Sequence, residues 1–112
     1  MARTGRGALR DRIADLAIEI EAARAMVHHT AAAIESGACP DAELVRLTSM
    51  CKTKTTETVK KTALEGVQMM GGYGYSMEFD MERHLRSAIP STIYGGTSEI
   101  QREIIAGSYG LR

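Results

Sequence analysis

The first third of the chain repeats apolar or small side chains every three or four residues, and this spacing limits the possible folds more than any other feature. The repeated positions are Leu9, Ile13, Leu16, Ile20, Ala23, Val27, Thr30 and Ile34. An α-helix has about 3.6 residues per turn, so the spacing places all of these side chains on one face of a long helix. Gly37 follows, where a glycine in the left-handed conformation commonly ends a helix. The many alanines from Ala22 to Ala33 let a neighbouring helix approach closely, which favours a packed bundle over an isolated coiled coil.

A second helix is expected after the turn at Cys39-Pro40-Asp41, because proline and aspartate suit the first residues of a helix. Its apolar or small residues again recur at steps of three and four, at Leu44, Leu47, Cys51, Thr55, Val59, Ala63, Val67 and Met70. The threonines from Thr53 to Thr62 are β-branched, and those from Thr53 to Thr58 alternate enough to imitate a strand. We predict a helix because the longer period extends over the whole segment, up to Gly71-Gly72.

Two shorter helices are expected in the last third of the chain. An amphipathic stretch from Met77 to Ala88 predicts one of them, and Pro90 should end it, because proline cannot continue the backbone ladder. The other should run from about Thr97-Ser98 to near Gly107. Its start has two interpretations: Ser98 with Gln101 matches a capping box, and Thr97 is an alternative N-cap.

These segments predict one all-α domain over residues 1–112, an up-down helical bundle of two long antiparallel helices plus one or two shorter ones. Residues 1–7 contain two arginines and two glycines and are expected to form a frayed arm. A chain of 112 residues buries a limited share of its surface. Any large cofactor that it handles therefore needs further protein around it.

Charge and aromatic content argue against several classes of partner. The 14 Lys and Arg residues balance 14 Asp and Glu residues, and only 4% of the residues are aromatic. The chain therefore offers neither a basic track for phosphates nor a stacking platform for bases, and no nucleic acid is expected. No apolar run approaches the roughly 20 residues that cross a bilayer. No membrane contact is expected, and the protein is predicted to be cytoplasmic.

No metal site is expected. Cys39 and Cys51 stand apart without a CxxC pair, which argues against a zinc site and against a disulfide scaffold. His28 and His29 are adjacent on the first predicted helix, so their side chains point about 100° apart and cannot clamp one metal ion.

Two glycine-rich turns are the candidate binding elements. Gly71-Gly72-Tyr73-Gly74 follows a helix, whereas a dinucleotide-binding loop follows a strand, so a helix cap and turn is the favoured interpretation. Gly95-Gly96-Thr97-Ser98 precedes a helix, whose free N–H groups and dipole favour an anion or a carbonyl oxygen. Simple capping is the alternative for this second turn.

Three blocks of sequence stand out when they are read together: QMMGGYGY from Gln68, ERHLR from Glu82 and TIYGGTSEIQR from Thr92. In order and spacing they resemble the C-terminal helical domain of the acyl-CoA dehydrogenases, and with the upstream helices the resemblance extends from about Leu9 to Gly107. It implies a flavoprotein oxidoreductase of fatty acid metabolism that converts an acyl-CoA thioester to the 2,3-enoyl-CoA. A carboxylate removes the α-proton while a hydride leaves the β-carbon for FAD.

The resemblance also implies two sets of cofactor contacts. The first set, which in the family meets the adenosine diphosphate part of FAD bound by a neighbouring subunit, is Gln68, Met69, Met70, Gly71 and Gly72. The second set lies beside FAD in its own site and consists of Thr97, Ser98 and Glu99. There the hydroxyl of Thr97 and the backbone donors of the helix N-terminus would face the cofactor.

Gly95 departs from the pattern of many family members, which carry the catalytic glutamate at this position. The chain is therefore expected to have no catalytic base there. The resemblance implies that Gly95 and Gly96 contact the substrate, with the backbone N–H of Gly95 donating to the thioester oxygen. Some branches of the family place the glutamate on an earlier helix, which would precede Met1. Ser87 and Ile89-Pro90 also differ from the acidic and basic residues that are usual in this stretch.

The expected function is the C-terminal part of a FAD-dependent acyl-CoA dehydrogenase, which contributes FAD and subunit contacts but is not active alone. The expected partners are an acyl-CoA substrate and either further copies of the chain or a larger dehydrogenase subunit. The alternative is a non-catalytic helical module, derived from that family, which forms oligomers or pairs with a partner subunit.

Overall fold

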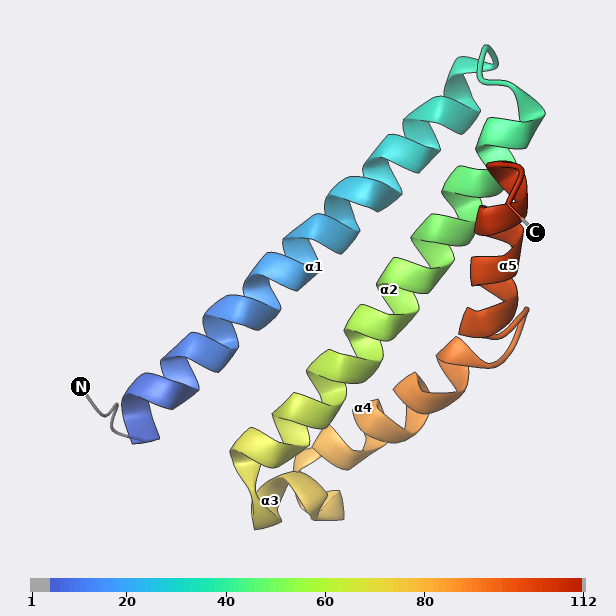
Figure 1. The fold of residues 1–112 in the computed structure, drawn as a ribbon. Coiled ribbons are helices and arrows are strands. Elements are labelled where there is room, and N and C mark those ends of the chain that lie inside the picture. Colours follow the sequence, from blue (N-terminus) through green and yellow to red (C-terminus); the bar gives the residue numbers. More distant parts are fainter. Residues whose placement is uncertain (1–4, 112) are drawn as a thin grey trace.

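Two long antiparallel helices and a bent arm of shorter ones make up the computed structural model, which describes residues 5–111 (Figure 1). The long helices are α1 (Gly5–Ser36) and α2 (Asp41–Met70). The arm consists of α3 (Gly72–Tyr75), the 3₁₀ helix η1 (Met77–Phe79), α4 (Met81–Ala88), the 3₁₀ helix η2 (Ile89–Thr92) and α5 (Ser98–Ser108). The predicted all-α fold, with two long antiparallel helices plus shorter ones, is confirmed.

Helix α2 is the centre of the arrangement. Helices α1, α4 and α5 all pack against it, and the arm returns along α2 on the side away from α1 (Figure 1). The molecule is elongated, with a radius of gyration of 17.1 Å, whereas a compact domain of this length has about 13 Å. The buried apolar residues within residues 5–111 are few, and most are small: Leu16, Ala23, Ala63 and Ala88. The described chain therefore leaves much of its apolar surface uncovered.

The turn between the long helices forms as the sequence predicts. Gly37 has φ +67°, a conformation that glycine adopts without strain, and its N–H donates to Ile34 O at 3.3 Å. Pro40 precedes the first residue of α2. At the other end of the chain, the expectation of a frayed arm is wrong for residues 5–7, which form the first turn of α1. Residues 5–7 contain no proline that would interrupt a helix. Residues 1–4 lie outside the part of the chain that the structure describes.

The threonine-rich part of α2 is helical, as the longer period predicts, because the hydroxyls bond within the helix. Thr53 Oγ1 donates to Ser49 O, and Thr55 Oγ1 donates to Cys51 O, each at 2.8 Å. Such a bond, to the carbonyl four residues earlier, satisfies the hydroxyl without leaving the helix. These bonds help to stabilise the helical conformation of residues that, being β-branched, otherwise favour strands.

The single helix predicted from Met77 to Ala88 is wrong in detail, because Asp80 adopts φ +62° and separates η1 from α4. The end of the predicted helix is confirmed, because α4 ends at Ala88, just before Pro90. Pro90 lies in the first turn of the 3₁₀ helix η2 that follows, where a missing N–H costs nothing because the first N–H groups of a helix have no internal partner.

Helix α5 begins at the alternative cap. Thr97 Oγ1 accepts a hydrogen bond from the Ile100 N–H at 3.3 Å, so Thr97 is the N-cap. The capping box of Ser98 with Gln101 is wrong, since the Gln101 side chain instead donates to Gly95 O at 3.2 Å. None of the helices in residues 5–111 is both long and apolar enough to cross a lipid bilayer.

Candidate functional site

The turn that joins η2 to α5 contains two glycines in conformations that other residues rarely adopt. Gly95 has φ +65° and Gly96 has φ +98°. A side chain at Gly95 would extend into open space, whereas a Cβ at Gly96 would lie 2.6 Å from Gln101 Nε2. The sequence therefore forms a tight turn here because both positions lack a side chain.

Three consecutive carbonyl groups of the turn, those of Tyr94, Gly95 and Gly96, accept hydrogen bonds from side chains. Lys52, on α2, donates through Nζ to Tyr94 O at 2.7 Å and also to Gly96 O. The Lys52 ammonium lies 5.8 Å from the centre of the Tyr94 ring, a cation–π distance. The Gly95 carbonyl accepts from Gln101. Two side chains from two helices thus hold the backbone of the turn in one orientation.

The N–H groups of the same turn are left without partners. From Gly95 to Glu99, five consecutive N–H groups make no hydrogen bond within residues 5–111. The next two are satisfied, Ile100 by the Thr97 hydroxyl and Gln101 by the Thr97 carbonyl at 2.9 Å. A run of free N–H groups at a helix N-terminus, where the helix dipole is positive, favours an anion or a carbonyl oxygen.

Ser98 adds a buried polar atom without a partner. Its residue is 8% exposed, and among buried side-chain atoms of the described chain its Oγ makes no hydrogen bond. Buried hydroxyl groups in folded proteins are nearly always bonded, so an unpaired one calls for a missing ligand, water or partner. Its position in the first turn of α5 places it beside the free N–H groups.

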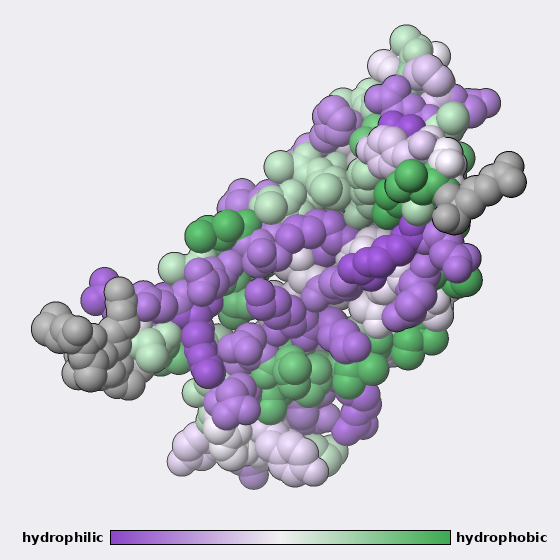
Figure 2. All heavy atoms as spheres, in the orientation of Figure 1, coloured by the Kyte–Doolittle hydropathy of each residue, from purple (hydrophilic) through white to green (hydrophobic). Residues whose placement is uncertain are grey.

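A hollow of about 540 Å³ lies next to this turn, between α5 and α2. It is lined by Glu57, Lys60, Lys61, Leu64, Thr92, Ile93, Thr97, Ser98, Glu99 and Arg102. Arg102 donates to both oxygens of Glu57 at 2.7 Å, and this bond holds the pKa of the guanidinium above its ordinary value. Figure 2 shows hydrophilic side chains gathered along the middle of this view of the molecule. The lining carries three cations and two carboxylates, and Glu57 is paired with Arg102, so a small excess of positive charge remains beside the helix N-terminus. This environment is suited to an anionic group.

The two predicted sets of cofactor residues lie far apart in the chain. Gln68, Met69, Met70, Gly71 and Gly72 form the end of α2 and its cap, with Gly71 at φ +63°. The set of Thr97, Ser98 and Glu99 begins α5, near Lys52 on α2. Lys52 and Gln68 are separated by about 24 Å along the helix axis, from a rise of about 1.5 Å per residue. One chain therefore does not bring the two sets into one site.

Sequence reasoning missed the residues that shape the turn from outside it. Lys52 and Gln101 hold its carbonyl groups, and Lys60, Lys61 and Arg102 supply the positive charge. Nothing in the sequence distinguishes Lys52 from the other lysines of α2, because the carbonyl groups that it binds lie more than 40 residues later in the chain. Within residues 5–111, no three His, Cys, Asp or Glu side chains are placed to hold a metal ion, and both cysteines are free.

The chain matches the family model described as "Acyl-CoA dehydrogenase, C-terminal domain" over residues 4–110. It belongs to this family. Its relatives include an acyl-CoA dehydrogenase of Bacillus subtilis (strain 168), 42% identical over 95 residues, which are 85% of this chain and 24% of that protein. A 3-sulfinopropanoyl-CoA desulfinase of Cupriavidus necator is 38% identical over 96 residues, which are 86% of this chain and 23% of that protein.

Solved structures agree with the family assignment. The solved FAD complex of PigA matches 99% of this chain and 30% of its own, with a TM-score of 0.87 and 30% identity. A chain in the structure of the electron transferring flavoprotein of Acidaminococcus fermentans matches 97% of this chain and 29% of its own, with a TM-score of 0.85 and 31% identity. The chain thus spans about a quarter of the length of the curated relatives above.

Proposed function

We propose that the chain is the C-terminal part of a FAD-dependent acyl-CoA dehydrogenase and contributes cofactor and subunit contacts to the α,β-oxidation of an acyl-CoA thioester. The observation that carries this proposal is the run of five unpaired N–H groups from Gly95 to Glu99, next to the unbonded Ser98 hydroxyl. Membership of the family supports a flavin cofactor and a thioester substrate, and the solved FAD complex of PigA supports the choice of FAD.

The residues at the start of α5 fit the anionic part of FAD. The free N–H groups of Ser98 and Glu99 would donate to phosphate oxygens, and the Ser98 hydroxyl would gain the partner it lacks. Lys60 and Lys61 add positive charge on the facing side of the hollow. FAD, when bound, supplies the acceptor for the hydride that leaves the β-carbon.

Gly95 has a different role in the proposal. Its N–H would donate to the thioester oxygen, where an oxyanion-hole donor is typically worth about 3 kcal/mol in the transition state. Lys52 turns the neighbouring carbonyl groups of Tyr94 and Gly96 toward α2, so they do not repel the oxygen. Gly95 itself has no side chain that can remove the α-proton, so the base must come from another part of the enzyme.

The segment from Gln68 to Gly72 would contact a second FAD, bound by a neighbouring subunit. Its distance from the α5 site, about 24 Å along α2 from Lys52 to Gln68, supports two separate cofactor contacts per chain. The elongated shape and the small enclosed core support the same view, since a chain built this way needs other protein to cover it. In isolation it should hold FAD weakly.

A chimera tests the proposal without relying on the isolated chain. The C-terminal quarter of the related Bacillus subtilis acyl-CoA dehydrogenase is replaced by this chain, and the purified protein is assayed for bound FAD and for bleaching of the flavin by acyl-CoA. We expect FAD to be retained. Bleaching should be lost, because the C-terminal domain of the chimera has glycine in place of the glutamate that removes the α-proton. Bleaching should return with Gly95→Glu, which restores that carboxylate. Loss of FAD in a folded chimera would contradict the proposed cofactor contacts.

A second candidate function is a non-catalytic assembly module derived from the same family. The observation that favours it is the exposed apolar surface of α1, where Ile13 is 53% exposed and Ile34 is 54% exposed. The chimera separates the two candidates, because an assembly module would neither retain FAD nor gain activity with Gly95→Glu.

A further inference from the structure

The turn before α5 contains three peptide units, each of which joins the carbonyl group of one residue to the N–H group of the next. Lys52 binds the carbonyl groups of Tyr94 and Gly96. The N–H groups of the same two units belong to Gly95 and Thr97. No peptide bond in the described part of the chain is cis, so each N–H group points away from the carbonyl group that Lys52 holds.

The middle unit of the turn is held in a different way. Its carbonyl group, that of Gly95, accepts a hydrogen bond from the neutral amide of Gln101 at 3.2 Å. Its N–H group is that of Gly96. None of the three N–H groups makes a hydrogen bond within the described chain. They therefore differ in the partner of their own carbonyl group, which is a cation for the outer two units and an uncharged donor for the middle one.

The positive charge of Lys52 is not neutralised by any carboxylate among the described residues. Lys54, on the same helix, donates to Glu19 at 2.5 Å, and Arg102 bonds to Glu57 at 2.7 Å. The hydrogen bonds of the half-buried Lys52 go to carbonyl groups of the turn instead. Hydrogen bonds from a charged donor are roughly twice as strong as those between neutral groups. The charge of Lys52 thus acts on the turn and is not cancelled beside it.

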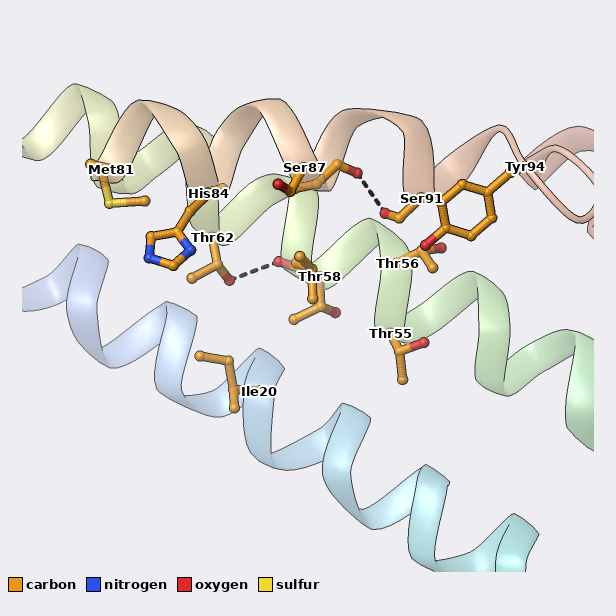
Figure 3. Close-up of a pocket in the computed structure, with 13 residues that line it drawn as sticks. Ile20, Thr55, Thr56, Thr58, Thr62, Met81, His84, Ser87, Ser91 and Tyr94 are labelled. Carbon is orange, nitrogen blue, oxygen red and sulfur yellow. Dashed lines mark hydrogen bonds between the residues drawn. The ribbon is translucent and has the colours of Figure 1, made fainter. Parts of the chain in front are cut away.

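The orientation of the turn has supports other than Lys52. The Tyr94 N–H donates to Pro90 O at 3.0 Å. In Figure 3 the Tyr94 ring points from the arm toward Thr56 on α2, and both residues line a groove of about 680 Å³. Gln101 holds the next carbonyl group along the chain. Several contacts therefore fix the direction of these peptide units, whereas only Lys52 brings a charge to them.

The peptide unit can pass the effect of this charge from its carbonyl end to its N–H end. Its C–N bond has partial double-bond character, so a donor that draws electron density toward the oxygen also draws it from the nitrogen. Hydrogen bonds in chains strengthen one another in this way, and more so where the local dielectric constant is low. A cation at the carbonyl oxygen makes the N–H of the same unit a stronger donor than a neutral amide does.

We propose that Lys52 is a positioning residue whose charge, passed through the peptide unit of Tyr94 and Gly95, strengthens the Gly95 N–H as a donor to the thioester oxygen. The inference rests on the proposed function and adds to it a role for the charge of Lys52. When the α C–H bond breaks, its proton goes to the base and its electron pair moves toward the thioester oxygen. A polarised donor therefore stabilises the enolate more than it stabilises the neutral thioester.

The first measurement needs neither flavin nor substrate. Amide shifts of the ¹⁵N-labelled chain are compared between the wild type, Lys52→Met and the control Lys54→Met, which removes a lysine of α2 that does not bind the turn. In Lys52→Met we expect the amide protons of Gly95 and Thr97 to move to lower chemical shift, because their units lose the cation. The amide of Gly96 should change much less, and the control should leave all three in place.

The second measurement uses the chimera with the Bacillus subtilis relative, with Gly95 kept, loaded with FAD and given a 3-oxoacyl-CoA. The α-proton of this ligand is acidic enough to be lost to water, so no base from the enzyme is needed. The absorbance of the enolate against pH gives the pKa of the bound ligand. Removing a whole oxyanion donor costs about 10²–10³-fold, so removing only its charge assistance should cost about tenfold. Lys52→Met should therefore raise the ligand pKa by about one unit.

Two further variants of the chimera separate the charge of Lys52 from a merely structural role. Lys52→Arg keeps the charge and the donors, so the ligand pKa should stay close to that of the unsubstituted chimera. Gln101→Ala loosens the turn without removing a charge, so it should raise the ligand pKa less than Lys52→Met does. Circular dichroism should show equal helix content in all variants. If Lys52→Met does not fold, Lys52→Gln, which also lacks the charge, replaces it.

Three results would overturn the inference: equal changes or no change at the three amides, a ligand pKa that loss of the Lys52 charge leaves unaltered, or an equal rise with Gln101→Ala. A folded chimera without FAD would contradict the proposed cofactor contacts, and the amide shifts of the isolated chain would still test Lys52. A chimera that keeps FAD but shows no change in ligand pKa would contradict the role of Lys52 alone.

Discussion

Alanine substitutions at Gly95 and Gly96 should separate the two constraints on the turn before α5. Both glycines have positive φ, so both substitutions carry the cost of a side chain in the left-handed region, about 1–2 kcal/mol. Only at Gly96 would the new Cβ meet another group, Gln101 Nε2 at 2.6 Å. Because Gln101 is 7% exposed and donates to Gly95 O, it cannot move without losing that bond.

The difference between the two variants can be estimated from this geometry. Displacing the Gln101 amide leaves buried polar groups without partners, which costs about 1–3 kcal/mol. Gly96→Ala should therefore lower the free energy of unfolding by about 1–3 kcal/mol more than Gly95→Ala. For a domain of this size, each kcal/mol lowers the melting temperature by about 4 °C.

Thermal and urea unfolding, followed by circular dichroism, provide the assay. The two alanine variants are compared in the wild-type chain and in Gln101→Ala, where the clash is absent. In that background the cost of Gly96→Ala should fall to about the cost of Gly95→Ala. Equal costs in the wild-type chain, or a Gly96→Ala penalty that survives Gln101→Ala, would refute the clamp that we assign to Gln101.

Three further predictions concern α5, the α1–α2 pair and the end of α2. Thr97→Ala removes the N-cap acceptor and should lower the free energy of unfolding by about 1 kcal/mol, whereas Thr97→Ser should not. The hydrogen bond and charge of Lys54 lower the pKa of Glu19 below its ordinary value of 4.5. The stability that this pair contributes is therefore present above pH 4.5 and is lost as the pH falls through the lowered pKa. The urea midpoints of the wild type and Lys54→Met should converge as this pH is reached. Gly74→Ala would place a Cβ 2.6 Å from a carbonyl oxygen of α2 and should lower the free energy of unfolding, measured in urea, by about 1–3 kcal/mol. A Cβ at Gly72 meets nothing within 4 Å, so the control Gly72→Ala should cause no steric loss of stability.

The long helices could be predicted from the sequence because their signals are local. The period of three and four residues identifies α1 and α2, and Gly37 and Gly71 end them with positive φ as expected. The threonine run was open to two interpretations, and hydroxyl bonds such as Thr53 to Ser49 are what a helix offers such residues.

The details of the arm could not be predicted, because they depend on conformations that side-chain patterns do not reveal. Asp80 breaks the stretch from Met77 to Ala88 by taking a left-handed conformation that is uncommon outside glycine. Pro90 continues the path as a 3₁₀ helix, since it falls where no backbone donor is needed.

The candidate site was only partly predictable. The turn from Gly95 to Ser98 could be located from its glycines and its position before a helix. Its chemistry depends on Lys52 and Gln101, which turn the carbonyl groups away and leave the N–H groups free. These contacts join segments that are distant in the chain, and no pattern within either segment reveals them.

The central claim is that the start of α5 holds the anionic part of FAD, in a site that the chain alone leaves incomplete. The most direct measurement is a titration of the ¹⁵N-labelled chain with FAD, followed by amide chemical shifts, with riboflavin as the control without phosphates. We predict weak binding that shifts the amides from Gly95 to Glu99 with FAD and leaves them in place with riboflavin. Tight stoichiometric binding, equal shifts with riboflavin, or no shift at these five amides would contradict the claim.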